Sequence, residues 1–253
     1  MSPTELVVLP SSDKLAANVA ARTLGRLREV LEQRTRAALA LTAGSIMESV
    51  WEQLARSTDA AGVEWSRVDV FWGDERFVPI ASHDRNDAPA ERVLFRNGPF
   101  SAATRYSMPA SGGRYGDDLD AAAAAYATTL AKARRPDDDG DVPNFDIVLL
   151  GVGPDGHCCS LFPDHPSAMD NSAPVIAVRN SPKPPPRRIS LSFEGLNTAN
   201  EIWVVASGSG KADAVARALS PDADRMHVPS AGARGRHQTL WLIDSDAAAD
   251  LPP

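Results

Sequence analysis

Residues 149–163 read LLGVGPDGHCCSLFP and carry the clearest structural signal in the chain. The largely apolar run at 145–150 that leads into them is typical of a strand covered on both faces. Gly151, Gly153 and Gly156 then allow the backbone to turn tightly and to approach a ligand closely. The stretch therefore predicts a strand of an α/β sheet followed by a ligand-binding turn.

Short strands and helices alternate along the rest of the chain. Strands are expected at residues 6–9, 38–42, 68–72, 145–150, 189–193, 202–206 and 240–243. Apolar residues have helical spacing within 46–54 and 212–219, and the alanine-rich segment 120–132 has a high helix propensity. This alternation predicts an α/β fold with a mainly parallel, doubly wound (Rossmann-like) sheet and helices on both faces.

Length and charge limit the class of protein. The 253 residues suit one large α/β domain, and the irregular segments 135–143 and 181–186 do not resemble long interdomain linkers, so we expect a single domain over 1–253. The net charge of -7 argues against a general affinity for nucleic acid or anionic membranes. A helix that spans a bilayer needs about 20 apolar residues, and no apolar run comes near this length. The N-terminal residues do not have the pattern of a signal peptide. We therefore expect a cytoplasmic protein.

In open α/β sheets, ligands bind beyond the carboxyl ends of the strands. Four predicted strand ends carry unusual loops, at residues 43–45, 73–76, 151–157 and 207–211. In the third loop, Asp155 and His157 lie two residues apart. A histidine can take a proton from water at neutral pH, and a nearby carboxylate can orient its ring. His157 is therefore a candidate general base with Asp155 orienting its ring, although a histidine in a glycine turn is often structural.

The loop at 73–76 belongs to the string FWGDERFVPIASHDRN, residues 71–86. Asp74 and Arg76 directly follow an apolar strand, so at least one of the charged side chains is expected to point into the cleft. Arg76 could hold a substrate oxygen with its planar guanidinium. The alternative is an ion-pair network with Asp84 and Arg85 that shapes the loop, and Glu75, Asp84, Arg85 and Asn86 are expected to be structural.

The other two loops predict an anion site. Gly44 and Ser45 lie between a strand and a helix, where backbone N–H groups bind anions and the serine can both cap the helix and donate to a phosphate oxygen. Lys211 stands where a second helix begins, a position that the helix dipole disfavours for a cation unless an anion lies between them. Arg187 and Arg188 open a strand and should point to opposite faces, so one of them is a further candidate.

The only two cysteines, Cys158 and Cys159, are adjacent and lack the spacing of a metal site or a disulfide staple. We expect them to fill the core. A redox-sensitive site is the alternative, because they directly follow His157.

The strings GDERFVP, GPDGH followed by SLFP, PPPRRISLSF and SGSGKA occur in an order that resembles 6-phosphogluconolactonases, over nearly the whole chain. The resemblance implies an α/β fold shared with glucosamine-6-phosphate deaminases, hydrolysis of 6-phosphoglucono-δ-lactone, and no metal or organic cofactor. It implies that His157 is the general base beside Asp155.

The same resemblance implies that Ser45, Arg188 and Lys211 hold the phosphate, and that Asp74 and Arg76 line the sugar site. The phosphate turn departs from the family's usual GGS, because Ala43 stands at its first position. The expected partner is a phosphorylated sugar lactone, and the expected state is a monomer or weak homodimer.

Two alternatives are open. A deaminase and isomerase of glucosamine 6-phosphate would place a glutamate shortly after the histidine, whereas this chain has Ser160-Leu161-Phe162-Pro163 there. A sugar-phosphate sensor would bind without turnover, and it would not need to keep both Asp155 and His157.

Overall fold

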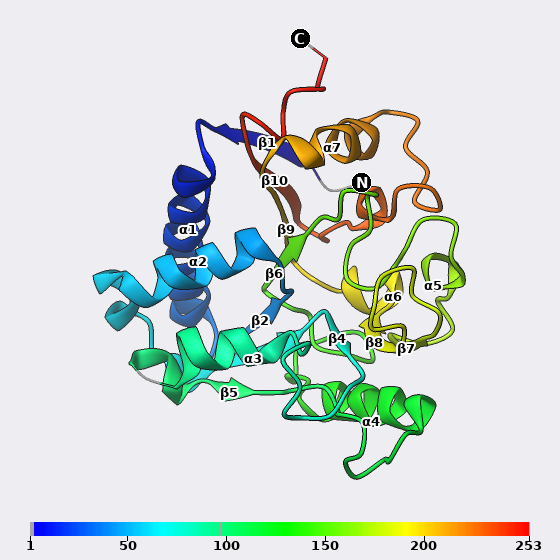
Figure 1. Ribbon diagram of the computed structural model, residues 1–253. Helices are drawn as coiled ribbons and strands as arrows, with labels where there is room; N and C mark the ends of the chain where they lie inside the picture. The colour runs from blue at the N-terminus through cyan, green and yellow to red at the C-terminus, as the bar shows by residue number, and fades with distance from the viewer. Residues whose placement is uncertain (1–2, 97, 253) are drawn as a thin grey trace.

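A computed structural model describes residues 3–96 and 98–252, and its centre is a seven-stranded sheet in which every neighbouring pair of strands is parallel (Figure 1). Across the sheet the order is β1-β10-β9-β6-β2-β3-β5. The strands are β1 (Thr4–Leu9), β2 (Ala37–Leu41), β3 (Val68–Trp72), β5 (Thr104–Arg105), β6 (Ile147–Gly151), β9 (Glu201–Ala206) and β10 (Gln238–Asp244). All residues of β2 and β3 are buried, which explains their continuous apolar sequences.

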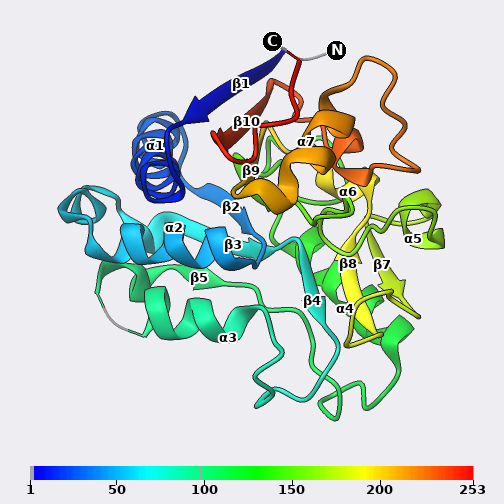
Figure 2. The same cartoon turned by 45° about the horizontal axis from the view of Figure 1, so that its top comes forward.

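Helices cover both faces of this sheet, as predicted. The main helices are α1 (Ser12–Gln33), α2 (Ser45–Arg56), α4 (Leu119–Lys132) and α7 (Ala212–Leu219), and the short ones are α3 (Asp87–Ala90), α5 (Pro166–Met169) and α6 (Phe193–Leu196). Helices α1 and α2 pack together on one side of the sheet, and α7 lies on the other (Figure 2). The amphipathic helix α1 was not among the predicted helices.

The order of the strands creates a switch point between β2 and β6. From β1 to β5 the chain moves across the sheet in one direction, and from β6 to β10 it moves in the other. Strands β2 and β6 are therefore neighbours whose following segments depart in opposite directions. This leaves a crevice beyond their carboxyl ends, where ligands bind in doubly wound folds.

A second, three-stranded antiparallel sheet corrects two predictions. Its order is β4 (Asp74–Arg76), β8 (Arg188–Leu191) and β7 (Val175–Val178). The segment 73–76 is therefore not only a strand-end loop, and the strand predicted at 189–193 belongs to this sheet and ends before α6. The physical reason is the pairing of β4 with a distant strand, which no local pattern encodes. The pairing fixes Asp74 opposite Ser190.

The buried side chains of both sheets and of the main helices form one continuous apolar core. Within this core, the Tyr126 hydroxyl on α4 accepts a hydrogen bond from the Trp72 backbone N–H at 3.0 Å. This contact holds the end of β3 just before the chain enters β4. Within the described ranges, no helix has both the length and the apolar character that a membrane crossing needs.

Candidate active site at the β2–β6 switch point

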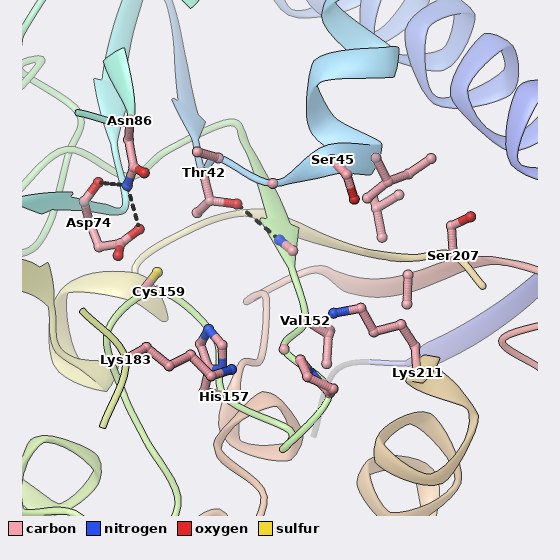
Figure 3. Close-up of a pocket in the computed structure, with 18 of the residues that line it drawn as sticks. Thr42, Ser45, Asp74, Asn86, Val152, His157, Cys159, Lys183, Ser207 and Lys211 are labelled. Atoms are coloured by element: carbon pink, nitrogen blue, oxygen red, sulfur yellow. Dashed lines mark hydrogen bonds between the residues drawn. The ribbon is translucent and has the colours of Figure 1, made fainter. Parts of the chain in front are cut away.

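A pocket opens at the carboxyl ends of the central strands, and it contains the predicted residues from all four strand-end loops (Figure 3). The Thr42 hydroxyl, just after β2, accepts a hydrogen bond from the Gly151 N–H at 2.9 Å and donates to the Leu149 carbonyl at 3.0 Å. These bonds tie the ends of β2 and β6 together. Thr42 and Gly151 both line the pocket, so this junction of the two strands forms part of its wall.

The glycine-rich turn after β6 places Asp155 against His157. The Gly153 N–H donates to the His157 carbonyl at 2.9 Å, and Gly156 adopts a φ of 90°, which favours glycine. Asp155 Oδ1 lies 2.5 Å from His157 Nδ1. The imidazole ring lies against the buried Phe162 ring, with 4.8 Å between centroids, so its orientation is fixed from two sides.

Lys183 joins this pair, although the sequence analysis did not select it. Its Nζ lies 3.0 Å from Asp155 Oδ1 and 3.0 Å from His157 Nδ1. The lysine comes from the proline-rich segment 181–186, which was predicted only to be stiff and extended. The one available signal was a cation in the middle of that segment.

The charges around Asp155 keep it ionised. Burial raises the pKa of this carboxyl, but the hydrogen bonds and positive charges of His157 and Lys183 outweigh burial and hold the pKa well below its usual range. Arg217 on α7 also donates to the Asp155 backbone carbonyl at 3.3 Å. The aspartate is therefore a permanent acceptor for the imidazole N–H.

Asp74 lines the pocket from β4 and is only 5% exposed. Its Oδ2 accepts from the Ser160 hydroxyl at 2.7 Å, and the Asn86 amide donates to its backbone carbonyl at 2.9 Å. Arg76 also lines the pocket, with Nη1 donating to the Asp84 carbonyl at 2.7 Å. Both predicted residues therefore lie at the pocket, and the Arg76 side chain is hydrogen-bonded to the loop that contains Asp84.

The structural interpretation of Glu75 and Arg85 fits their environment. Glu75 is 1% exposed and accepts backbone N–H bonds from Arg76, Asn86 and Asp87 at 2.6–3.0 Å. Arg85 lies 3.4 Å from Glu75 and 2.7 Å from Asp87. This buried network closes the loop behind the pocket wall.

Arg187 and Arg188 point to opposite sides, as the alternation predicts. Arg187 is half-exposed and lies over the Phe77 ring. Arg188 is 4% exposed and lines the pocket, where its N–H groups meet three backbone carbonyls of the segment 181–186. Only Arg188 is therefore placed to act at the site.

The turns that the sequence predicts to bind an anion lie on the far side of the pocket. Gly44, with a φ of 146°, is the N-cap of α2, and Ser45 is its first residue. The prediction that Ser45 caps the helix is therefore wrong, because the glycine takes the non-helical conformation, and the serine hydroxyl faces the pocket (Figure 3). Ser207 follows β9 on the same side.

Lys211 is the N-cap residue of α7, so it stands at the start of this helix, as predicted. Burial lowers its pKa, the charge of Lys183 lowers it further, and Asp155 acts in the opposite direction. The two lysines reach toward His157 from opposite sides of the pocket (Figure 3). An anion between them would relieve their mutual repulsion.

Cys158 and Cys159 are both buried, in agreement with the core-filling interpretation. Burial raises the pKa of both thiols, and the charge of Asp74 raises it further. Cys159 also lines the pocket and packs closely against Gly73. Thiols of this kind react slowly at neutral pH, so the geometry disfavours a redox-sensitive site.

Across residues 3–96 and 98–252, no three His, Cys, Asp or Glu side chains gather into a candidate metal site. The fold and the pocket define a doubly wound α/β protein with a histidine–aspartate pair and two lysines at its switch point.

Comparisons with known proteins give the family. The family of glucosamine-6-phosphate isomerases/6-phosphogluconolactonase matches residues 10–241. A 6-phosphogluconolactonase of Streptomyces coelicolor is 45% identical over 100% of this chain and 97% of its own length. The structure of 6-phosphogluconolactonase from Trypanosoma brucei is similar with a TM-score of 0.83, at 26% identity and with 100% of both chains covered. The chain belongs to this glucosamine-6-phosphate isomerase/6-phosphogluconolactonase family.

A monomeric glucosamine-6-phosphate deaminase has a TM-score of 0.75 at 20% identity, and 97% of this chain and 99% of that chain are covered. This likeness concerns the fold alone. It confirms that the fold is shared with such deaminases.

Proposed function

We propose that this protein hydrolyses 6-phosphoglucono-δ-lactone to 6-phosphogluconate, a step of the oxidative pentose phosphate pathway. The observation that carries the proposal is the pairing of Asp155 with His157 at the switch point, between two lysines that face the same pocket. A neutral histidine held by a carboxylate suits the removal of a proton from water. The lysines suit an anionic substrate.

In the proposed mechanism, the ionised Asp155 accepts a hydrogen bond from the protonated Nδ1 of His157, which leaves Nε2 unprotonated and able to accept a proton. His157 takes a proton from water while the water oxygen attacks C1 of the lactone. The bond between C1 and the ring oxygen then breaks, and His157 returns the proton to the departing C5 oxygen. Arg76 or backbone N–H groups of the pocket stabilise the negative charge that forms on the carbonyl oxygen bonded to C1. A lactone is already reactive, so no covalent enzyme intermediate is needed.

The phosphate is proposed to bind where α2 and α7 begin. The N–H groups at the start of α2 and the hydroxyl of Ser45 offer donors, and Lys211 supplies a charge from the opposite wall. The side chains of Asp74 and Arg76 line the part of the pocket proposed for the sugar ring.

The environment of Phe162 favours a lactonase over a deaminase. This side chain occupies the stretch after the histidine and packs against the His157 ring. A phenylalanine moves no proton, so the acid–base residue that a deaminase would place there is missing. We therefore rank the deaminase second and the sensor third.

The test is the disappearance of lactone generated from glucose 6-phosphate, with the spontaneous hydrolysis rate subtracted. The wild-type protein should accelerate hydrolysis, and His157→Ala should lose most of the acceleration, about 10²–10⁴-fold. The matched control is His227→Ala, because His227 forms an exposed 2.6 Å pair with Asp164. Full activity of His157→Ala would disprove the mechanism, and no acceleration by the wild type would disprove the function.

We further propose that the enzyme acts in the cytoplasm as a monomer or weak homodimer and needs no metal or organic cofactor. Dialysis against a chelator should leave kcat unchanged. Sedimentation at several protein concentrations should give a mass near 26.9 kDa at low concentration.

A further inference from the structure

The segment 181–186 lines the pocket through Lys183 and Pro184, and Lys183 Nζ lies beside the Asp155–His157 pair. We propose that Lys183 is a positioning residue that fixes Asp155 against His157, and that Arg188 holds the Lys183 segment in place instead of binding the phosphate. The inference rests on the proposed lactonase function and assigns roles to two residues within it.

Asp155 Oδ1 receives two donors, Nδ1 of His157 at 2.5 Å and Nζ of Lys183 at 3.0 Å. A carboxylate oxygen has two lone pairs, so it can accept both. Lys183 Nζ also lies 3.0 Å from Nδ1. An ammonium has no lone pair to accept a hydrogen bond, so with Nδ1 protonated both nitrogens donate to Oδ1 of Asp155. The ammonium thereby limits rotation of the carboxylate, and the Nδ1 proton remains directed at Oδ1.

The guanidinium of Arg188 is largely committed to the segment 183–185. Its Nε donates to the Pro185 carbonyl at 3.1 Å, and its Nη2 donates to the carbonyls of Lys183 and Pro184 at 3.0 and 3.2 Å. The remaining nitrogen, Nη1, lies 3.9 Å from Asp74 Oδ2. The backbone therefore uses three of the five N–H donors of Arg188, and the other two, on Nη1, face Asp74. This leaves few donors for a phosphate.

Two further contacts link Arg188 to the catalytic pair. Its guanidinium lies over the Phe162 ring at 5.6 Å, and the same ring contacts His157. Within the segment, the Ser181 hydroxyl donates to the Lys183 carbonyl at 2.8 Å and accepts from its N–H at 3.3 Å. The segment is therefore held from both sides, so that Lys183 Nζ stays beside Asp155.

The neighbouring residue supplies a matched control. Arg187 shares the strand end, but its side chain lies over Phe77 and pairs with Asp117 at 3.6 Å, away from the pocket. If an effect of substituting Arg188 comes only from the lost positive charge at this strand end, substitution of Arg187 should produce the same effect.

The experiment measures kcat and KM for the lactone in Lys183→Met, Arg188→Met, the double variant and Arg187→Met. We expect Lys183→Met and Arg188→Met each to lower kcat about 10-fold, a part of the about 10²–10⁴-fold contribution of a positioned general base. KM and the inhibition constant of inorganic phosphate should change by less than about 3-fold. The double variant should be no slower than the worse single variant, because both act through one arrangement. Lys183→Arg should recover part of kcat, and Arg187→Met should match the wild type.

Three results would overturn the proposal. A rise in KM and in the phosphate inhibition constant with unchanged kcat would make Lys183 or Arg188 a phosphate ligand. Multiplicative losses in the double variant would mean that the two residues act independently. Wild-type kcat in Lys183→Met would remove any role for the ammonium.

Because Arg188 is buried, a circular dichroism melting curve is needed to establish whether Arg188→Met is folded. If Arg188→Met is unfolded, Arg188→Lys replaces it in the comparison of single and double variants. A lysine keeps the positive charge but cannot make all three hydrogen bonds to the backbone carbonyls. Inactive wild-type protein would instead refute the lactonase function itself, which separates the two failures.

Discussion

Oδ1 of Asp155 lies 2.5 Å from Nδ1 of His157, within a turn that Gly153 and Gly156 make possible. The contact assigns the imidazole proton to Nδ1 and directs Nε2 away from the carboxylate. Only in this tautomer does the ring present a proton acceptor on its other side. The turn therefore determines both where the base lies and which nitrogen acts.

Replacement of Asp155 by asparagine should lower kcat by about 10²–10⁴-fold without unfolding the protein, because the amide can donate to Nδ1 and stabilise the opposite tautomer. The measurement is the kcat for lactone hydrolysis, corrected for the spontaneous reaction. Asp164→Asn is the control, since Asp164 pairs with the exposed His227 at 2.6 Å. A kcat within about 3-fold of the wild type would show that the aspartate does not select the tautomer.

Gly153→Ala should abolish most of the activity. A β-carbon at this position would overlap the ring of His157 and Oδ1 of Asp155, so the pair would have to move apart. Kinetics and a melting curve together test the expectation. Gly25→Ala, in the interior of α1 where a β-carbon meets no atom within 4 Å, should keep full activity and gain about 0.5–1 kcal/mol of stability. An active Gly153→Ala enzyme would contradict the geometry of the turn.

Lys211→Met should raise KM for the lactone about 10-fold or more and weaken inhibition by inorganic phosphate, with a smaller effect on kcat. The reason is the loss of a half-buried cation where α7 begins, opposite the turn at Ser45. Lys14→Met, on the exposed first turn of α1, is the control. If kcat falls while KM is unchanged, Lys211 does not hold the phosphate.

Glu75 should make stability depend on pH. Burial raises its pKa from 4.5 to about 7, against the opposing charge of Arg85. Between these two pH values the folded protein binds more protons at Glu75 than the unfolded chain, so this contribution to stability is complete below pH 4.5 and is lost as the pH rises through about 7.

Urea unfolding of the wild type and of Glu75→Gln at several pH values measures this contribution. The wild-type free energy of unfolding, minus that of the variant, should decline as the pH rises from 4 to 8. A difference that grows with pH would mean that the backbone N–H donors and Arg85 outweigh burial.

Much of the site followed from local sequence because its parts are strand ends. The apolar run at 68–72 predicted β3 with the observed bounds, and the run at 202–206 predicted β9 to within one residue at its start. The loops that follow both strands lie at the pocket. Parallel strands bring their carboxyl ends to one edge of the sheet, so residues from separate loops could be expected to meet. The position of Ser45 was predicted correctly, but the capping role belongs to Gly44, because only the backbone conformation distinguishes the two.

By itself, the sequence determined the alternation of strands and helices, the glycine turn that pairs Asp155 with His157, and the family. These depend on short-range patterns, in which apolar spacing and glycine positions directly limit the backbone. The tertiary structure alone decided that β4 pairs with β8, that Arg188 contacts the proline-rich segment, and that Lys183 reaches Asp155 across 28 positions of the chain. Such contacts depend on how distant segments pack, and a cation between prolines carries no local signal of the carboxylate that it will meet.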